Sequence, residues 1–155
     1  MLNLEELLST NSFLLIPNPT SKKMVFDKIC SKSFQNYNID KNLLLNNLIK
    51  REKIGTTTIG NGIAIPHVQS DQITKPSCIV SILSKGLDFD ALDNNPVDLI
   101  VFLILPEINK SENLQVLAQV SRLLRNSDIT DKLRGCKSEE SAFAIISQHL
   151  KNKAA

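Results

Sequence analysis

The apolar run Leu99–Leu105 constrains the fold more than any other part of the chain. It contains no polar residue and ends at Pro106, so a strand over Val97–Leu105 must be covered on both faces. A membrane-spanning helix would need about 20 apolar residues, and no run of that length occurs. We therefore expect a central strand with helices on both sides of its sheet.

Two helices are expected before this strand. Thr20 or Ser21 can cap the first helix, and Asp40 can cap the second, which Gly55 can end. Both segments have apolar residues at helical spacing. In the first these are Val25, Phe26, Ile29, Cys30, Phe34 and Tyr37, and in the second Leu44, Leu45, Leu48 and Ile49.

A second strand is expected at Cys78–Leu83, and further helices follow the central strand. Ser111, Asp128 and Ser138 are the candidate N-caps of a long helix, a short helix ending at Gly135, and a last helix. Helices before and after a central sheet predict an α/β fold. We expect a single-domain α/β sandwich with a mixed central sheet flanked by helices on both faces.

Length and charge limit the function classes. The 155 residues, 42% of them hydrophobic, fit one domain over residues 1–155. A net charge of +2 from 18 basic and 16 acidic residues, without a run of like charges, gives no electrostatic case for nucleic-acid binding. Glu5 and Glu6 oppose a secretory signal, so we expect a cytoplasmic protein without membrane insertion.

Cysteine and histidine spacings predict no metal site. Cys30, Cys78 and Cys136 form no CxxC pair, which favours free buried thiols over a disulfide framework or a zinc knuckle. Of the two histidines, neither His67 nor His149 belongs to an HExxH motif. We interpret His149, in a helix tail with Lys151 and Lys153, as a solvated residue.

The most unusual stretch is GTTTIGNGIAIPH, from Gly55 to His67. Its glycines and threonines favour a short strand and a tight loop over a helix. His67 follows an apolar segment and Pro66, whose ring restrains the backbone before the imidazole. A neutral imidazole can attack phosphorus or accept a proton. A hydrogen-bonded structural histidine is the alternative.

Several groups near His67 in sequence could hold an anion. Gly60-Asn61-Gly62 could expose backbone N–H groups, and Thr56, Thr57 and Thr58 could add hydroxyl donors, although a plain turn remains an alternative. Arg51, in the last turn of its helix, is either a solvated cation or a bidentate partner for a phosphorylated His67.

These residues carry a resemblance to a known family. Arg51-Glu52 together with Gly55–His67 resembles the phosphorylation-site signature of the type-2 enzyme IIA domains of the bacterial phosphotransferase system. FDALD at Phe89–Asp93 and PVDL at Pro96–Leu99 resemble the next block of that family. The likeness extends over nearly the whole chain and is nearer, by eye, to the nitrogen-type regulatory branch.

The resemblance implies a phosphoryl carrier. His67 would accept a phosphoryl group from an HPr-type phosphocarrier, with Arg51 as its catalytic partner and no cofactor or metal. The phosphoryl-binding groups would be Thr56, Thr57, Gly60, Asn61, Gly62 and Asn113. A nitrogen-type IIA would regulate a kinase, channel or transporter through its phosphorylation state. A fructose- or mannitol-type IIA would instead pass the group to a IIB domain.

Two positions depart from the family pattern. Val68 stands where a small residue usually follows the active histidine, and a β-branched side chain there needs an extended backbone. Asn113 stands where many members have a second histidine, and an amide can donate a hydrogen bond but cannot become a cation. A binding module with a decayed site is therefore a third alternative.

Overall fold

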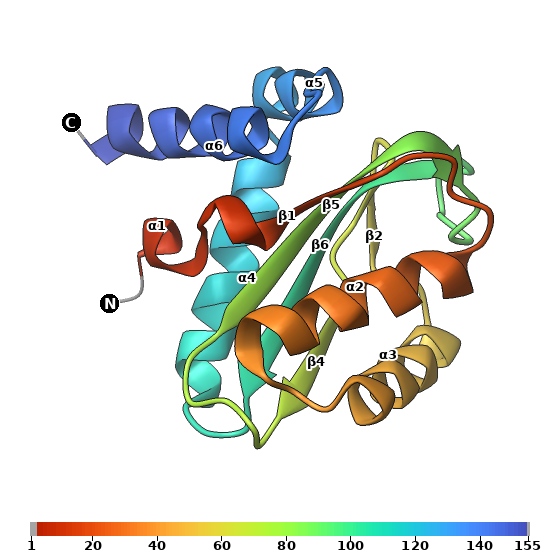
Figure 1. Ribbon diagram of the computed structural model, residues 1–155. Coiled ribbons are helices and arrows are strands. Elements are labelled where there is room, and N and C mark those ends of the chain that lie inside the picture. Colours follow the sequence, from red (N-terminus) through yellow and green to blue (C-terminus); the bar gives the residue numbers. More distant parts are fainter. Residues whose placement is uncertain (1–2, 155) are drawn as a thin grey trace.

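The computed structural model describes residues 3–154, and its centre is the predicted apolar strand. This strand, β6 (Val97–Pro106), lies between β5 (Ser77–Leu87) on one side and β3 (Ile63–Ala64) with β4 (His67–Ser70) on the other. The sheet is completed at its edges by β1 (Phe13–Ile16) and β2 (Thr58–Gly60), giving the order β1-β5-β6-β3-β2 with β4 also paired to β6 (Figure 1).

The sheet is mixed, as expected. β5 and β6 pair antiparallel, whereas β1 runs parallel to β5, and β3 and β4 run parallel to β6. The register of β4 places His67 opposite Leu103, and that of β3 places Ile63 opposite Leu99. The short β3 and β4 thus follow one another along the same edge of β6.

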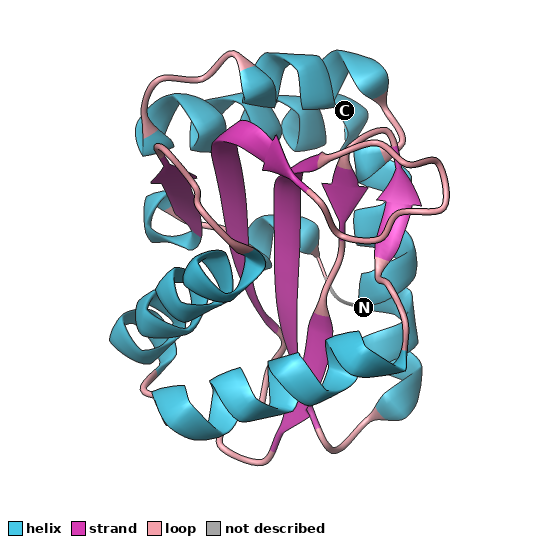
Figure 2. Cartoon of the chain, turned by 90° about the vertical axis from the view of Figure 1, so that its right-hand side faces the viewer, coloured by secondary structure: helices cyan, strands magenta, loops and turns pink. Residues whose placement is uncertain are grey.

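Both faces of β6 are buried under helices, which confirms the α/β sandwich. Leu99, Val101 and Leu103 belong to a core cluster shared with α1 (Leu4–Leu7), α4 (Lys110–Leu124), α5 (Ser127–Arg134) and α6 (Glu139–Ala154). Ile100, Phe102 and Ile104 belong to a second cluster shared with α2 (Lys22–Tyr37) and α3 (Lys41–Ile54). Helices accordingly lie on both sides of the strands (Figure 2).

Five predicted helix ends are confirmed. The side chains of Ser21 and Asp40 accept the N–H groups of Met24 and Leu43, and Ser138 accepts that of Ser141. Gly55 is the C-cap of α3, and Gly135 is the C-cap of α5.

Two predicted N-caps are wrong by two residues each. Asn109, with φ of 63°, caps α4 in place of Ser111, and its backbone carbonyl accepts the N–H of Asn113. Asn126 caps α5 in place of Asp128, because its side-chain oxygen accepts the N–H groups of Asp128 and Ile129. Both caps are therefore asparagines just before the expected position.

Strands β1 and β4 were not predicted, the segment Gly55–His67 contains two short strands where one was expected, and one residue expected in the core is exposed. β1 and β4 are only four residues long, and β4 contains three polar side chains. Phe34, expected in the core, is 51% exposed because the buried face of α2 continues from Cys30 through Ser33.

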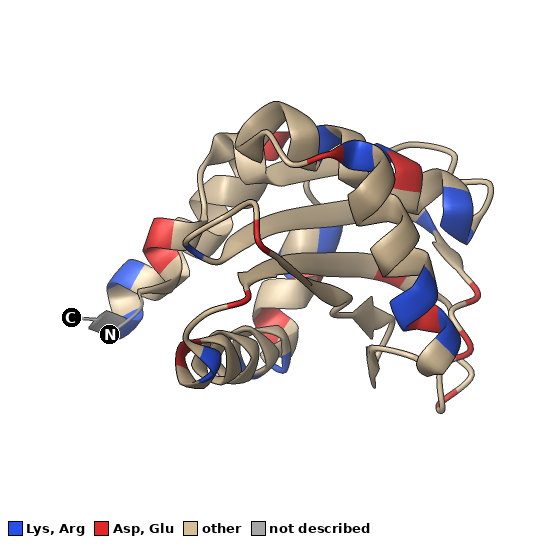
Figure 3. Cartoon of the chain, turned by 90° about the horizontal axis from the view of Figure 1, so that it is seen from below, with Lys and Arg blue, Asp and Glu red and all other residues tan. Residues whose placement is uncertain are grey.

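Charged positions of both signs lie on the side of the chain seen in Figure 3. In the view of Figure 3, basic and acidic positions are interspersed over the helices and loops, while most of the sheet is uncharged. Among the described residues, no helix is both long and apolar enough to cross a membrane.

Candidate functional site

His67 is the first residue of β4 and has a restrained imidazole. The carbonyl of the preceding Pro66 accepts the N–H of Leu103, which holds the backbone against β6. The ring atom Nδ1 lies 2.9 Å from the carbonyl oxygen of Ile65. Because a carbonyl oxygen only accepts hydrogen bonds, Nδ1 carries the proton in the neutral imidazole, and Nε2 then has the lone pair. In that form the half-buried ring leaves Nε2 as the nitrogen that could act as a nucleophile.

A cavity of about 620 Å³ lies beside this ring. It contains three cations, Lys50, Arg51 and Lys110, and no carboxylate is among its lining residues in the described part of the chain. The cavity is lined by Asn47, Lys50, Arg51, Ile54, His67, Val68, Gln69, Leu105, Lys110, Asn113, Leu114 and Leu117. These residues come from α3, β4, β6 and α4, so the helices of both faces meet at the end of the sheet where His67 lies.

Arg51 is brought to the same cavity by the last turn of α3. Its Nη1 donates a hydrogen bond of 3.1 Å to the carbonyl oxygen of Gly55, the residue that ends the helix. One N–H of the guanidinium is used in this way, and the planar group still has other N–H donors. The structure therefore places a restrained cation in the lining of the cavity that His67 also lines.

Asn113 also lines the cavity but is nearly buried, with 4% of its surface exposed. Its Nδ2 donates a hydrogen bond of 2.8 Å to the carbonyl oxygen of Pro106. Its Oδ1 has no hydrogen-bond partner within residues 3–154. The amide orientation is set by the Pro106 carbonyl, because the opposite orientation would bring two acceptors together.

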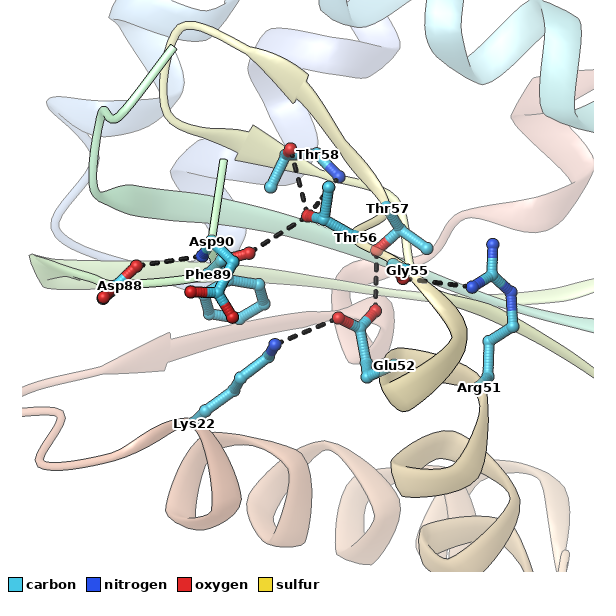
Figure 4. A network of polar contacts seen from close by, with 10 residues as sticks. All are labelled: Lys22, Arg51, Glu52, Gly55, Thr56, Thr57, Thr58, Asp88, Phe89 and Asp90. Carbon is cyan, nitrogen blue, oxygen red and sulfur yellow. Dashed lines mark hydrogen bonds and ion pairs between the residues drawn. The ribbon is translucent and has the colours of Figure 1, made fainter. Parts of the chain in front are cut away.

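The hydroxyl groups of Thr56 and Thr57 are occupied outside the cavity. Thr56 donates to the carbonyl of Phe89, and Thr57 donates to the carboxylate of Glu52 (Figure 4). Neither threonine lines the cavity, and Thr57 is only 8% exposed. The structure thus gives both side chains a role in the loop that joins α3 to β2.

Gly60, Asn61 and Gly62 are not close to His67. Asn61 and Gly62 are the turn of the β2–β3 hairpin, with positive φ angles of 57° and 77° that an Asn-Gly pair readily adopts. Since Ile63 pairs with Leu99 and His67 with Leu103, the turn lies about 13 Å or more along β6 from the histidine. The plain-turn alternative therefore describes this segment better than an anion nest for His67.

The turn is held by its own polar partners. The carboxylate of Asp93 accepts the backbone N–H of Asn61, and this hydrogen bond is the main cause of a lowered pKa for Asp93. Arg134 of α5 forms an ion pair with Asp98 at 2.9 Å and donates to the carbonyl of Asn61. A side chain at Gly62 would be strained, because φ is 77° and a Cβ there would lie 3.1 Å from the backbone carbonyl oxygen of Pro96.

Sequence reasoning missed three contributors to the site. Lys50 precedes Arg51 directly, and its place on α3 could have suggested that it shares the cavity. Lys110 comes from the start of α4, at the end of β6, where the chain returns toward His67. Glu52 was part of the recognised motif without a role, although it holds Thr57.

Comparisons with known proteins give a consistent result. Residues 6–149 match the family model described as phosphoenolpyruvate-dependent sugar phosphotransferase system, EIIA 2. A nitrogen regulatory protein of Pseudomonas aeruginosa is 36% identical over 147 residues, which cover 94% of this chain and 96% of that protein.

Two solved structures have the same fold. The nitrogen regulatory protein IIA-Ntr of Neisseria meningitidis superposes with a TM-score of 0.82 at 27% identity, covering 92% of this chain and 97% of that one. The mannitol enzyme IIA of Escherichia coli, solved in complex with phosphorylated enzyme IIB, gives a TM-score of 0.76 at 15% identity. In that second comparison 91% of this chain and 97% of the other are covered.

Proposed function

Because the chain belongs to the EIIA 2 family of the phosphoenolpyruvate-dependent sugar phosphotransferase system, we propose that it carries a phosphoryl group on His67. The observation that most supports this role is the hydrogen bond from Nδ1 to the Ile65 carbonyl. It leaves Nε2 as the atom with a lone pair, beside a cavity that contains cations.

The proposed reaction is a direct transfer. The Nε2 lone pair attacks the phosphorus atom, the Nε2–P bond forms, and the bond to the donor breaks with its electron pair remaining on the donor. The imidazole then carries positive charge, which the Ile65 carbonyl stabilises through the Nδ1–H group. Such transfers depend mainly on in-line positioning and on stabilisation of charge on the phosphoryl oxygens.

Arg51 would supply most of that charge stabilisation. A guanidinium can give two parallel hydrogen bonds to a phosphoryl group, and each is stronger than a hydrogen bond between neutral groups. Lys50 and Lys110 would add positive charge at the rim of the same cavity. Asn113 would contribute the N–H of Nδ2 that Pro106 does not use.

We propose an HPr-type phosphocarrier as the donor and a regulatory role for the phosphorylated state. The 36% identity to a nitrogen regulatory protein supports the regulatory branch. Its partners would be a kinase, channel or transporter protein. A IIB domain as acceptor is the second candidate, supported by the fold shared with the mannitol enzyme IIA that was solved with its IIB partner.

The proposal is tested by transfer from a phosphorylated HPr-type carrier labelled with ³²P. We expect label on the wild type that is lost in mild acid and kept in alkali, as for phosphorus bonded to nitrogen, and no label on His67→Ala. Label that survives acid, or that persists in His67→Ala, would contradict the proposal.

A further inference from the structure

Thr57 connects the two ends of the candidate site. Its hydroxyl donates a hydrogen bond of 2.8 Å to Oε1 of Glu52, the neighbour of Arg51 in the last turn of α3. Its backbone carbonyl accepts the N–H of Ile65 at 3.0 Å. Ile65 in turn provides the carbonyl that accepts the hydrogen bond of His67 Nδ1. One residue thus contacts the supports of both Arg51 and His67.

The loop closed by this contact contains the anchor of Arg51. Gly55, whose carbonyl accepts the hydrogen bond from Arg51 Nη1, lies between Glu52 and Thr57. A Cβ added at Gly55 would have no heavy atom within 4 Å, so packing does not hold this residue. Glycine also has the greatest backbone freedom. The position of the Gly55 carbonyl therefore depends on the contacts of neighbouring residues. The Glu52–Thr57 hydrogen bond restrains the chain on both sides of Gly55.

The buried carboxylate of Glu52 is paired with a basic side chain. Its side chain is 6% exposed, and its Oε2 lies 3.1 Å from Lys22 Nζ of α2. Lys22 Nζ lies 4.6 Å from the centre of the Phe89 ring and 5.9 Å from that of Phe26. A carboxylate in the last turn of a helix is also disfavoured by the helix dipole. The pairing with Lys22 alone therefore does not explain why a carboxylate is buried at this end of α3.

Resting on the proposed function, we propose that Thr57 is a positioning residue, held by Glu52, that fixes Arg51 relative to His67. Figure 4 shows Glu52 between Lys22 and Thr57, with Arg51 turned away toward Gly55. Thr57 acts through this geometry and does not bind the phosphoryl group, because its hydroxyl is donated to Glu52 and its side chain does not line the cavity.

The test is a double-mutant cycle on single-turnover transfer from a phosphorylated HPr-type carrier. Thr57→Val removes the hydroxyl and keeps the branched shape. We expect it to lower the maximal rate by about tenfold and to change the half-saturating donor concentration by less than about twofold. Thr57→Ser should restore the rate. In the Arg51→Ala background Thr57→Val should have little further effect, because the residue that it positions is absent.

Other results would overturn the inference. A wild-type rate for Thr57→Val would show that Arg51 needs no such support. An equal loss in the Arg51→Ala background would show that Thr57 does not act through Arg51. Asp27→Asn is the matched control, since it breaks the Asp27–Lys41 ion pair that joins the same two helices farther from Arg51. It should leave the rate unchanged.

A second readout separates this inference from the proposed function. In ¹H–¹⁵N spectra of the unphosphorylated protein, Thr57→Val should shift the Arg51 Nε–H signal, and Asp27→Asn should not. An unchanged Arg51 signal in Thr57→Val would overturn the positioning role. A shifted signal in a protein that accepts no phosphoryl group would support the positioning role and contradict the proposed function.

Discussion

The Nδ1 atom of His67 donates a hydrogen bond to the carbonyl oxygen of Ile65, two residues earlier in the chain. This contact sets both the orientation and the tautomer of the imidazole. Ile65 is itself 5% exposed and is held to Thr57 by its N–H. The imidazole of His67 is thus positioned by backbone groups of the buried segment that precedes it.

Arg51→Lys should slow transfer to His67 by about tenfold or more. Lysine keeps the charge but loses the planar fork that can bind two phosphoryl oxygens and, at the same time, the Gly55 carbonyl. Transfer rates from one phosphorylated donor provide the measurement. Lys53→Arg, which changes another basic residue in the last turn of α3 outside the cavity lining, is the control. Wild-type kinetics in Arg51→Lys would remove Arg51 from the site.

Val68→Gly should change the transfer rate by less than about tenfold. The extended backbone that Val68 requires is present, because Val68 lies in β4 opposite Ile104. The side chain is 8% exposed and packs in the cluster with α2 and α3, so the variant should lose about 2–4 kcal/mol of unfolding free energy. Urea unfolding and transfer kinetics measure the two effects. An inert wild type and a rapidly phosphorylated Val68→Gly would contradict this expectation and favour a decayed site.

Asn61→Gly should leave the transfer rate within about twofold of wild type. Glycine adopts the positive φ of this turn position without strain, and the turn lies far from His67. Gly62→Ala, in contrast, should unfold at lower urea concentration, because its Cβ would crowd Arg134 and Asp98 at a φ of 77°. A large loss of transfer in a stable Asn61→Gly would return this loop to the phosphoryl site.

Buried thiols should make the protein less stable at alkaline pH. Burial raises the pKa of Cys30 and that of Cys78 from 9.0 to about 12. Above pH 9.0 the unfolded chain releases these protons while the folded chain keeps them, so the unfolding free energy falls as pH rises toward about 12. Cys78→Ala should make this decline shallower in urea unfolding across that range. An equally steep decline in Cys78→Ala would contradict the assignment.

The fold could be predicted from the sequence wherever one signal dominated. The run Leu99–Leu105 identified the central strand, and Ser21, Asp40 and Gly55 marked helix ends through side-chain or backbone chemistry that acts within a few residues. β1 and β4 were missed because strands of four residues owe their existence to pairing with β5 and β6, which is not encoded locally.

The same contrast between local signals and contacts formed only in the folded chain holds for the site. His67, Arg51 and Asn113 were all predicted and all line one cavity. The hydroxyls of Thr56 and Thr57 are adjacent to the histidine motif in sequence, but a tertiary contact with Phe89 occupies the first and a local contact with Glu52 the second. The Asn61-Gly62 pair is a strong hairpin signal that was interpreted as a candidate anion site, and the register of β3 on β6 separates it from His67.

The most direct test of phosphoryl transfer to His67 is intact mass after incubation with phosphoenolpyruvate, enzyme I and an HPr-type carrier. The account predicts an increase of one phosphoryl group on the wild type, no increase on His67→Ala, and no increase when the carrier is omitted. An unmodified wild type under conditions in which the carrier itself becomes phosphorylated, or an equal increase on His67→Ala, would contradict it.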